Sequence, residues 1–206
     1  MNDFSSPPPA TADELAKFAV FRSTPPADLQ ALARVLRVRQ YEPGELVFER
    51  GDSGDALFLI RRGQVRIFIR DDQDNEVNFR FYGAGQAIGE FSLIDGQPRS
   101  ASADAYDLAQ LLILGREDFQ SLLRDHPMIG IEMMRELAER IRYTTRFLER
   151  VLAAVELLRH EDYGRALQEM VLDAADDQMQ EMVTTFIEMV HAVQQRQGAS
   201  STEPGS

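Results

Sequence analysis

Residues 89–102 are the most informative segment of this 206-residue chain and read Gly89-Glu90-Phe91-Ser92-Leu93-Ile94-Asp95-Gly96-Gln97-Pro98-Arg99-Ser100-Ala101-Ser102. A turn that begins at Gly89 leaves several backbone N–H groups without partners, and such groups attract a phosphate. Arg99 adds a permanent charge in a planar fork that matches phosphate oxygens, and Ser100 adds a hydroxyl donor. An ionised Glu90 only accepts hydrogen bonds, so it suits a sugar hydroxyl. Together these groups predict a nucleotide-binding site.

The order of these residues, G-E-F-S-L-I-x-G-x-P-R-S-A-S, closely resembles the phosphate-binding cassette of cyclic-nucleotide-binding domains. Three upstream segments look like the same family: Gly-Glu-Leu-Val-Phe at 44–48, Gly-Asp-Ser-Gly-Asp-Ala-Leu-Phe-Leu-Ile at 51–60, and Gly-Gln-Val at 63–65. The resemblance extends over residues 18–158. It implies an α+β domain built on an antiparallel, jelly-roll-like β-roll with flanking helices.

The resemblance also implies roles for the cassette residues. Glu90 would bond the ribose 2′-hydroxyl, while Arg99 and Ser100 would hold the cyclic phosphate. Gly89, Phe91 and Ser92 would complete the ligand site. The structural alternative is a β-barrel corner that carries an exposed Glu and Arg.

Composition excludes several other classes of function. The net charge of −12 disfavours a nucleic-acid surface and an anionic membrane. Without cysteine there are no disulfides and no thiolate chemistry. The three histidines lack metal-ligand spacing, and no nucleophile elbow or Walker loop is present. We therefore expect a binding protein with no catalytic residue, no metal and no cofactor.

The termini and the hydropathy pattern bear on location. Residues 1–11 carry three successive prolines and are expected to be disordered. No basic region followed by an apolar run resembles a signal peptide. No apolar stretch approaches the roughly 18 residues that span a bilayer. These features predict a cytoplasmic protein without a membrane contact.

Residues 12–127 are expected to form the β-roll with helices at its N-terminal side. Thr11 and Glu14 make a capping box that predicts a helix through Phe21, and Thr24 before Pro25 predicts a second helix. From residue 38 to residue 114 the apolar pattern alternates, with frequent turn signals, which indicates short antiparallel strands.

Two of these strands bear on the ligand. Val65 and Ile67 alternate with polar residues in one strand, and Val77, Phe79 and Phe81 do so in another. The family resemblance implies that inward-facing Ile67 and Phe79 wall the ligand. The alternative, which the sequence supports equally well, is that both side chains simply fill the core.

Residues 128–159 are predicted to be a dimerisation helix. Apolar residues recur at alternating spacings of three and four, a period that marks a coiled-coil seam. This seam would join two copies through residues 134–158, and its members are Met134, Leu137, Ile141, Thr144, Leu148, Val151, Val155 and Leu158. The alternative is an apolar stripe packed against the chain's own barrel.

The same helix resembles the dimer helix of bacterial cyclic-AMP receptor (catabolite activator) proteins around Arg140-Ile141-Arg142-Tyr143-Thr144-Thr145. The resemblance implies that Thr144 and Thr145 contact the base and that Arg140 pairs with Glu90. The ligand would be cyclic AMP, or cyclic GMP, because a hydroxyl both donates and accepts. Alternatively, Arg140 and Thr145 are ordinary solvated residues.

Residues 160–198 are expected to form a C-terminal helix after a break at 160–164, where Asp162 would cap it, and residues 199–206 a disordered tail. The family's winged helix-turn-helix is not recognisable in this segment, which is acidic and rich in methionine, so direct DNA binding is not expected. Its Met-rich face would pack within the dimer or dock a protein partner.

These features predict a homodimeric cyclic-nucleotide receptor that signals through protein contacts. Ligand would shift the angle or register of the long helices, and the break at 160–164 would transmit that shift. Two alternatives remain open. One is a transcription regulator that acts on DNA by another mode or through a partner, and the other is an adaptor that binds a cyclic dinucleotide.

Overall fold

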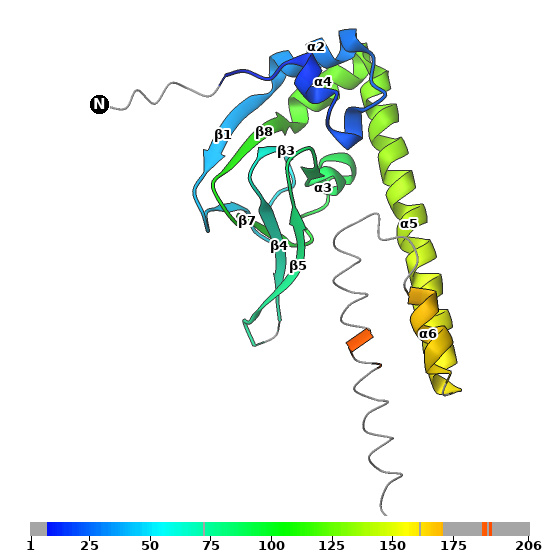
Figure 1. Cartoon of the computed structure of the whole chain (residues 1–206). Helices are drawn as coiled ribbons and strands as arrows, with labels where there is room; N and C mark the ends of the chain where they lie inside the picture. The colour runs from blue at the N-terminus through cyan, green and yellow to red at the C-terminus, as the bar shows by residue number, and fades with distance from the viewer. Residues whose placement is uncertain (1–7, 72, 161, 171–186, 189, 191–206) are drawn as a thin grey trace, which may run out of the picture. The chain divides into compact units, whose positions relative to one another are not determined.

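The computed structural model describes residues 8–71, 73–160 and 162–170, together with residues 187, 188 and 190. The chain divides into two compact units, residues 1–137 and residues 138–206. The first unit holds the N-terminal helices, all the strands and the beginning of the long helix (Figure 1). Each unit is described by itself.

The N-terminal segment forms two helices and a turn: α1 (Ala12–Leu15), the 3₁₀ helix η1 (Ala19–Phe21) and α2 (Pro26–Val35). The Thr11 hydroxyl accepts a hydrogen bond from the Glu14 amide at 3.3 Å, which confirms the cap. One continuous helix to Phe21 was the wrong prediction, because Phe18 has an extended backbone between α1 and η1. This break lets both Phe18 and Phe21 reach the core.

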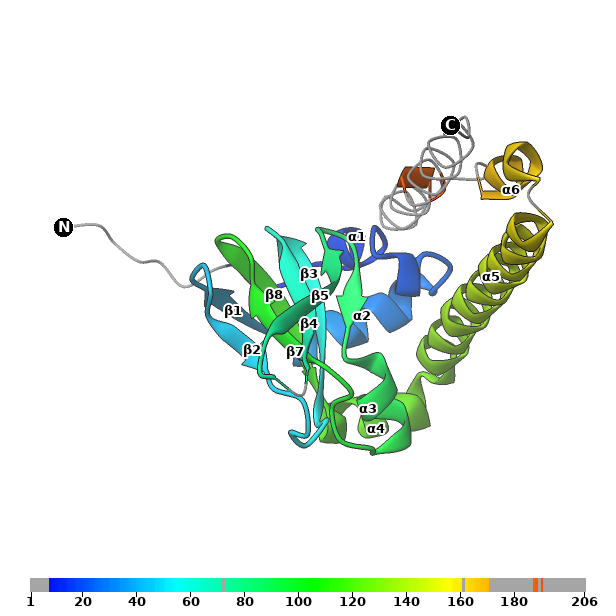
Figure 2. The ribbon, with the colours of Figure 1, turned by 90° about the horizontal axis from the view of Figure 1, so that it is seen from below.

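In the part of the chain that the structure describes, eight strands form two four-stranded antiparallel sheets, which can be followed in Figure 2. One sheet has the order β1 (Arg37–Tyr41), β8 (Ala109–Gly115), β3 (Ala56–Arg62), β6 (Ala87–Ile88). The other has the order β2 (Leu46–Phe48), β7 (Ser102–Ala105), β4 (Val65–Arg70), β5 (Glu76–Tyr82). The arrangement confirms the antiparallel β-roll with flanking helices.

Strand β3 is buried on both faces. Successive side chains of a strand point to opposite sides, so neighbouring residues of β3 enter different clusters. Leu57 and Leu59 pack in a cluster with the helices, whereas Phe58 and Ile60 pack in a second cluster with side chains of both sheets. Burying each of these side chains contributes about 1.5–3 kcal/mol. The double burial explains why this strand reads as an unbroken apolar run.

A register shift between Ile67 and Phe68 changes which side chains of the β4–β5 hairpin face inward. Simple alternation along β5 would place Phe81 on the inner face, but Phe81 pairs with Arg66, on the face opposite to buried Ala103 and Ala105. Phe81 is accordingly 39% exposed and makes an edge contact with exposed Tyr106. Phe81 therefore lies on the outer face of this sheet.

Helices α4 (Arg116–Asp125) and α5 (Pro127–Arg159) come directly after β8. Pro127 opens α5, where a proline has no N–H that needs a partner. Helices α2 and α4 lie side by side (Figure 1), and Nδ1 of His126 lies 2.8 Å from Oδ1 of Asp28.

The second unit contains the rest of α5 and α6 (Tyr163–Met170). Asp162 caps α6 by accepting a hydrogen bond from the Arg165 amide at 3.2 Å, as predicted. Val151 and Leu158 pack in a cluster with buried Ala154 and Ala166. Most of the predicted Met-rich helix lies outside the described residues.

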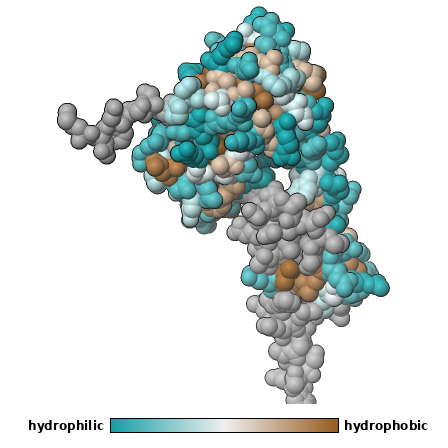
Figure 3. Space-filling model, turned by 45° about the horizontal axis from the view of Figure 1, so that its top comes forward, coloured by the Kyte–Doolittle hydropathy of each residue, from teal (hydrophilic) through white to brown (hydrophobic). Residues whose placement is uncertain are grey.

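The surface of the first unit seen in Figure 3 is mostly hydrophilic, with hydrophobic side chains in separate small patches. Among the described residues, no helix is both long enough and apolar enough to cross a membrane. On α5, four apolar residues of the second unit stay exposed in the single chain: Ile141, Leu148, Leu152 and Val155.

Candidate functional site

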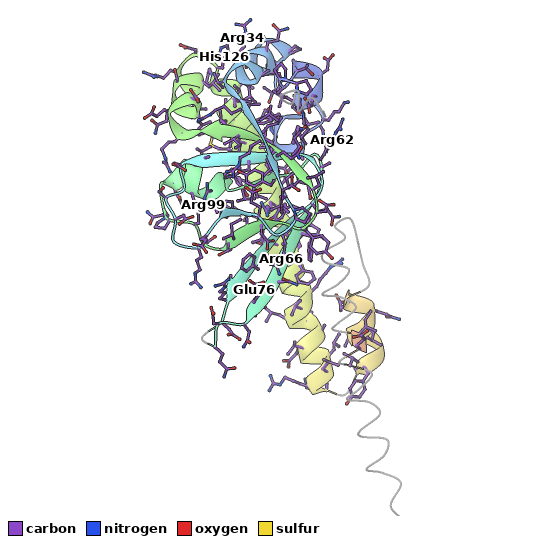
Figure 4. The ribbon with its side chains drawn as sticks, turned by 90° about the vertical axis from the view of Figure 1, so that its left-hand side faces the viewer. Arg34, Arg62, Arg66, Glu76, Arg99 and His126 are labelled. Atoms are coloured by element: carbon purple, nitrogen blue, oxygen red, sulfur yellow. The ribbon has the colours of Figure 1, made fainter. Side chains whose placement is uncertain are left out.

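The centre of the site is the buried guanidinium of Arg99, whose side chain lies among the strands of the roll (Figure 4). Arg99 is only 4% exposed. Its Nη1 donates to the carbonyl of Gly89 at 2.9 Å, and its Nη2 donates to the carbonyl of Ala56 at 2.6 Å. Its buried Nε donates to no atom of the described residues. The guanidinium is therefore held firmly by two backbone carbonyls, with donor capacity left over.

Aromatic rings support the same guanidinium from the interior of the roll. The guanidinium carbon lies 4.4 Å from the ring centroid of Phe48 and 5.6 Å from that of Phe58. Such contacts contribute about 0.5–2 kcal/mol each, more when water is excluded. The cation is thus placed by packing as well as by hydrogen bonds.

Burial lowers the pKa of Arg99, and the carboxylates of Asp55, Asp52 and Glu90 act in the opposite direction. An arginine remains protonated in proteins despite such a shift. A buried cation that has no directly bonded carboxylate is costly to desolvate, and a bound anion removes that cost. The electrostatics of the site therefore favour an anionic ligand.

Gly89 is required beside Arg99 for two independent reasons. Its φ of +82° lies in the left-handed region, which glycine adopts without steric cost. A Cβ on this residue would also lie 2.4 Å from Nη1 of Arg99. Gly89 caps α3 (Glu90–Asp95), whose first residue, Glu90, is 7% exposed. The turn predicted at this glycine is confirmed.

A second arginine fixes the cassette to the rest of the domain. Nη2 of Arg116 donates to the carbonyls of Gly54 and Ser92, each at 2.6 Å, and the Arg116 amide donates to the carbonyl of Asp55 at 2.7 Å. A Cβ on Gly54 would lie 1.8 Å from Cβ of Ser92, so α3 packs directly on the loop before β3. Arg116 begins α4 and links three segments.

The structure brings together four of the predicted site residues: Gly89, Glu90, Ser92 and Arg99. The Ser92 side chain is buried against Gly54, which indicates a packing role. Phe91 and Ser100 are exposed beside these residues.

The remaining predicted residues lie on other elements. Ile67 is half-buried on β4 and packs against the cluster between the sheets. Phe79 lies on β5, and its side chain is outside the described part of the structure. Arg140, Thr144 and Thr145 belong to the part of α5 in the second unit. Each threonine hydroxyl donates to the carbonyl four residues earlier, at 3.0 Å and 2.9 Å respectively, and keeps lone pairs to accept hydrogen bonds.

Sequence reasoning missed four residues that shape the site: Phe48, Gly54, Phe58 and Arg116. Phe48 and Phe58 have the pattern of strand residues, and nothing local shows that their rings contact Arg99, which lies 51 and 41 positions further along the chain. Gly54 was visible as a turn glycine within the resembling segment 51–60, but its contact with Ser92 is long-range. Among the described residues, no group of three or more acidic or histidine side chains is placed to hold a metal ion.

Comparison with known proteins agrees with this geometry. Residues 38–126 match the family described as the cyclic nucleotide-binding domain. The cyclic AMP receptor protein of Thermus thermophilus is 35% identical over 123 residues, which cover 60% of this chain and 57% of that protein. A CRP-like cAMP-activated global transcriptional regulator of Mycobacterium tuberculosis is 31% identical over 130 residues, covering 63% of this chain and 58% of the regulator.

A solved structure shows the same fold. The N-terminal domain of a transcriptional regulator from Streptomyces coelicolor A3(2) superposes with a TM-score of 0.57 at 29% identity, covering 64% of this chain and 94% of that one. Residues 38–126 are therefore a cyclic nucleotide-binding domain, and the homologues of the chain include CRP-like regulators. The chain spans less than two thirds of the length of the two curated relatives.

Proposed function

We propose that this protein is a receptor for a cyclic mononucleotide and performs no catalytic step. The observation that carries the proposal is the buried Arg99 guanidinium, which is fixed by the carbonyls of Gly89 and Ala56 and whose Nε has no acceptor among the described residues. A cyclic phosphate offers two unesterified oxygens that share one negative charge. Such a phosphate can neutralise the charge of the guanidinium, so no carboxylate besides that of Glu90 has to be buried beside it.

Glu90 supports a ligand that carries both an anion and a hydroxyl group. Its carboxyl is buried near Arg99, close enough to raise the arginine pKa. An inorganic phosphate would meet this carboxylate as a like charge, whereas a ribose hydroxyl would donate to it. The pair of residues therefore favours a sugar phosphate over a simple anion.

Output is proposed to pass through protein contacts between two copies and a further partner. The exposed apolar residues of α5, spaced at seven for Ile141, Leu148 and Val155, support self-association. The net charge of −12 opposes direct contact with a phosphate backbone. The contact of Thr144 and Thr145 with the base, and cyclic AMP as the ligand, rest on the sequence resemblance alone.

Calorimetric titration with cyclic AMP, cyclic GMP and cyclic di-GMP tests the proposal. We expect one cyclic mononucleotide to bind with one site per chain. Arg99→Gln should weaken binding roughly 10- to 150-fold, the effect of losing one charged hydrogen-bonding group. The exposed Arg62→Gln is the matched control and should leave the affinity unchanged. Undiminished affinity in Arg99→Gln, or binding of cyclic di-GMP alone, would contradict the proposal.

A transcription regulator is the second candidate function. One relative, 31% identical in sequence, is a CRP-like transcriptional regulator. A mobility-shift assay with random-sequence DNA, with and without the nucleotide that binds, distinguishes a DNA-binding regulator from a receptor that acts through protein contacts. Retardation that depends on nucleotide would favour the regulator.

A further inference from the structure

Arg80 faces the interior of the roll, a position that the sequence pattern does not indicate. In the β4–β5 pair Arg80 lies opposite Ile67, and in the β4–β7 pair Ile67 lies opposite Ala103. Directly opposed residues of paired strands share one face of a sheet. Ala103 is fully buried in the cluster between the sheets, so Arg80 projects toward that same interior.

The Arg80 guanidinium is placed there by an aromatic ring. Its carbon lies 4.5 Å from the ring centroid of Tyr82, and Tyr82 belongs to the cluster between the sheets. Arg80, Ile67 and Phe48 are all only half-buried although they face or border this interior. The inner face is therefore partly accessible to solvent at these three residues.

Arg80 and the ring that supports Arg99 lie on the two outer strands of one sheet. Arg99 stacks on Phe48 of β2, and β2 and β5 are the two outer strands in the order β2-β7-β4-β5. Three strand spacings separate them, on the order of 14 Å. A nucleotide has its phosphate at one end and its base at the other. A nucleotide whose phosphate lies at Arg99 and whose base extends along this sheet would bring the base to β4 and β5.

We infer that Arg80 is a specificity-determining residue that recognises the base, and that it favours guanine over adenine. A guanidinium has donors and no acceptor. The O6 and N7 atoms of guanine are two adjacent acceptors that match it, whereas adenine presents N7 beside an N6 amino group that is itself a donor. This inference rests on the proposed function and revises the sequence-based expectation of cyclic AMP to cyclic GMP.

Calorimetric titration of the full chain with cyclic AMP, cyclic GMP and cyclic IMP tests the inference. Wild type should bind cyclic GMP on the order of tenfold more tightly than cyclic AMP, the usual discrimination of a bidentate arginine. Cyclic IMP, which keeps O6 and N7 but lacks the 2-amino group, should bind like cyclic GMP. Arg80→Gln should reverse the preference, because a glutamine amide matches N6 and N7 of adenine.

Two further variants complete the experiment. Arg70→Gln changes an exposed arginine of the same hairpin and should leave the ratio of affinities unchanged. Arg80→Lys keeps the charge but loses the fork, and should lower the preference without reversing it. Circular dichroism and the melting temperature establish that each variant is folded.

The outcomes separate the inference from the proposed function. If no cyclic mononucleotide binds to the wild type, both are overturned. If nucleotides bind but cyclic AMP is preferred, or if Arg80→Gln leaves the ratio unchanged, the role of Arg80 is overturned and the receptor function stands. If cyclic GMP binds tightly and cyclic IMP binds weakly, the protein recognises the 2-amino group of guanine, and the role of Arg80 is again overturned.

Discussion

The guanidinium of Arg99 lies on the ring of Phe48, with 4.4 Å between its central carbon and the ring centroid. The two residues are on different segments, the loop before β7 and the strand β2. Their contact places a permanent charge against the cluster between the two sheets. The charge is therefore fixed in position before any ligand arrives.

Replacing that ring should weaken nucleotide binding without removing the charge. Phe48→Leu keeps an apolar side chain but loses the cation–π contact, so the affinity should fall by roughly two- to fivefold. Phe68→Leu is the matched control, because its ring lies 4.6 Å from the guanidinium carbon of Arg66 and outside the site. Calorimetry of both variants makes the comparison. Equal losses in the two would show that the effect is on general stability.

Gly89 offers a test of backbone geometry. Gly89→Ala should place a methyl carbon against Nη1 of Arg99 and displace the guanidinium, so nucleotide affinity should fall by at least tenfold. Gly44→Ala is the control, since its φ of +80° carries the same backbone strain, yet nothing lies within 4 Å of the added carbon. Both should lose about 1–2 kcal/mol of unfolding free energy. An unchanged affinity in Gly89→Ala would contradict the prediction.

The ion pair of Glu14 with Arg61 predicts a dependence of stability on pH. The hydrogen bond from Arg61 is the main cause that lowers the pKa of Glu14 below its ordinary value of 4.5. The folded state thus binds fewer protons than the unfolded state, so the pair stabilises the fold above the unfolded pKa. This contribution is lost as the pH falls through the folded pKa.

Urea denaturation at several pH values measures this effect. Glu14→Gln should be less stable than wild type at pH 7, and the difference should shrink as the pH falls below 4.5. The same series on Asp13→Asn, an exposed neighbour on α1, should show no such convergence. A difference that persists unchanged at pH 3 would refute the role of the ion pair.

The exposed stripe of α5 predicts self-association. Leu148 is 56% exposed in the single chain, and Leu148→Lys would place a charge at the centre of the proposed seam. We expect this variant to be monomeric by analytical ultracentrifugation where wild type is dimeric. Glu149→Lys makes the adjacent exposed position positive and should remain dimeric. A monomeric wild type would contradict the prediction of a dimer seam on α5.

The cassette and the alternation of short strands were predictable because they depend on local residue order. The resemblance of residues 89–102 located the half-buried Gly89 and the buried Glu90 and Arg99, and the turn signals located most hairpins. The helix expected through Phe21 was wrong because burial of Phe18 and Phe21 outweighs continuation of the helix.

The interior position of Arg80 was not predictable for a different reason. A one-residue shift between Ile67 and Phe68 exchanges the two faces of β5, and no local signal in the hairpin marks it. Likewise, the support of Arg99 by Phe48 and Phe58 depends on how two sheets pack, which single-strand patterns do not encode.

The double hydrogen bond of Arg116 to Gly54 and Ser92 has a thermodynamic consequence. Because one nitrogen links the cassette helix α3 to the loop before β3, these two segments are held together without a ligand and need not become ordered when one enters. Association then loses little conformational entropy, and most of the contact energy is expressed as affinity. The proposed receptor would therefore respond to a scarce messenger with a small interface.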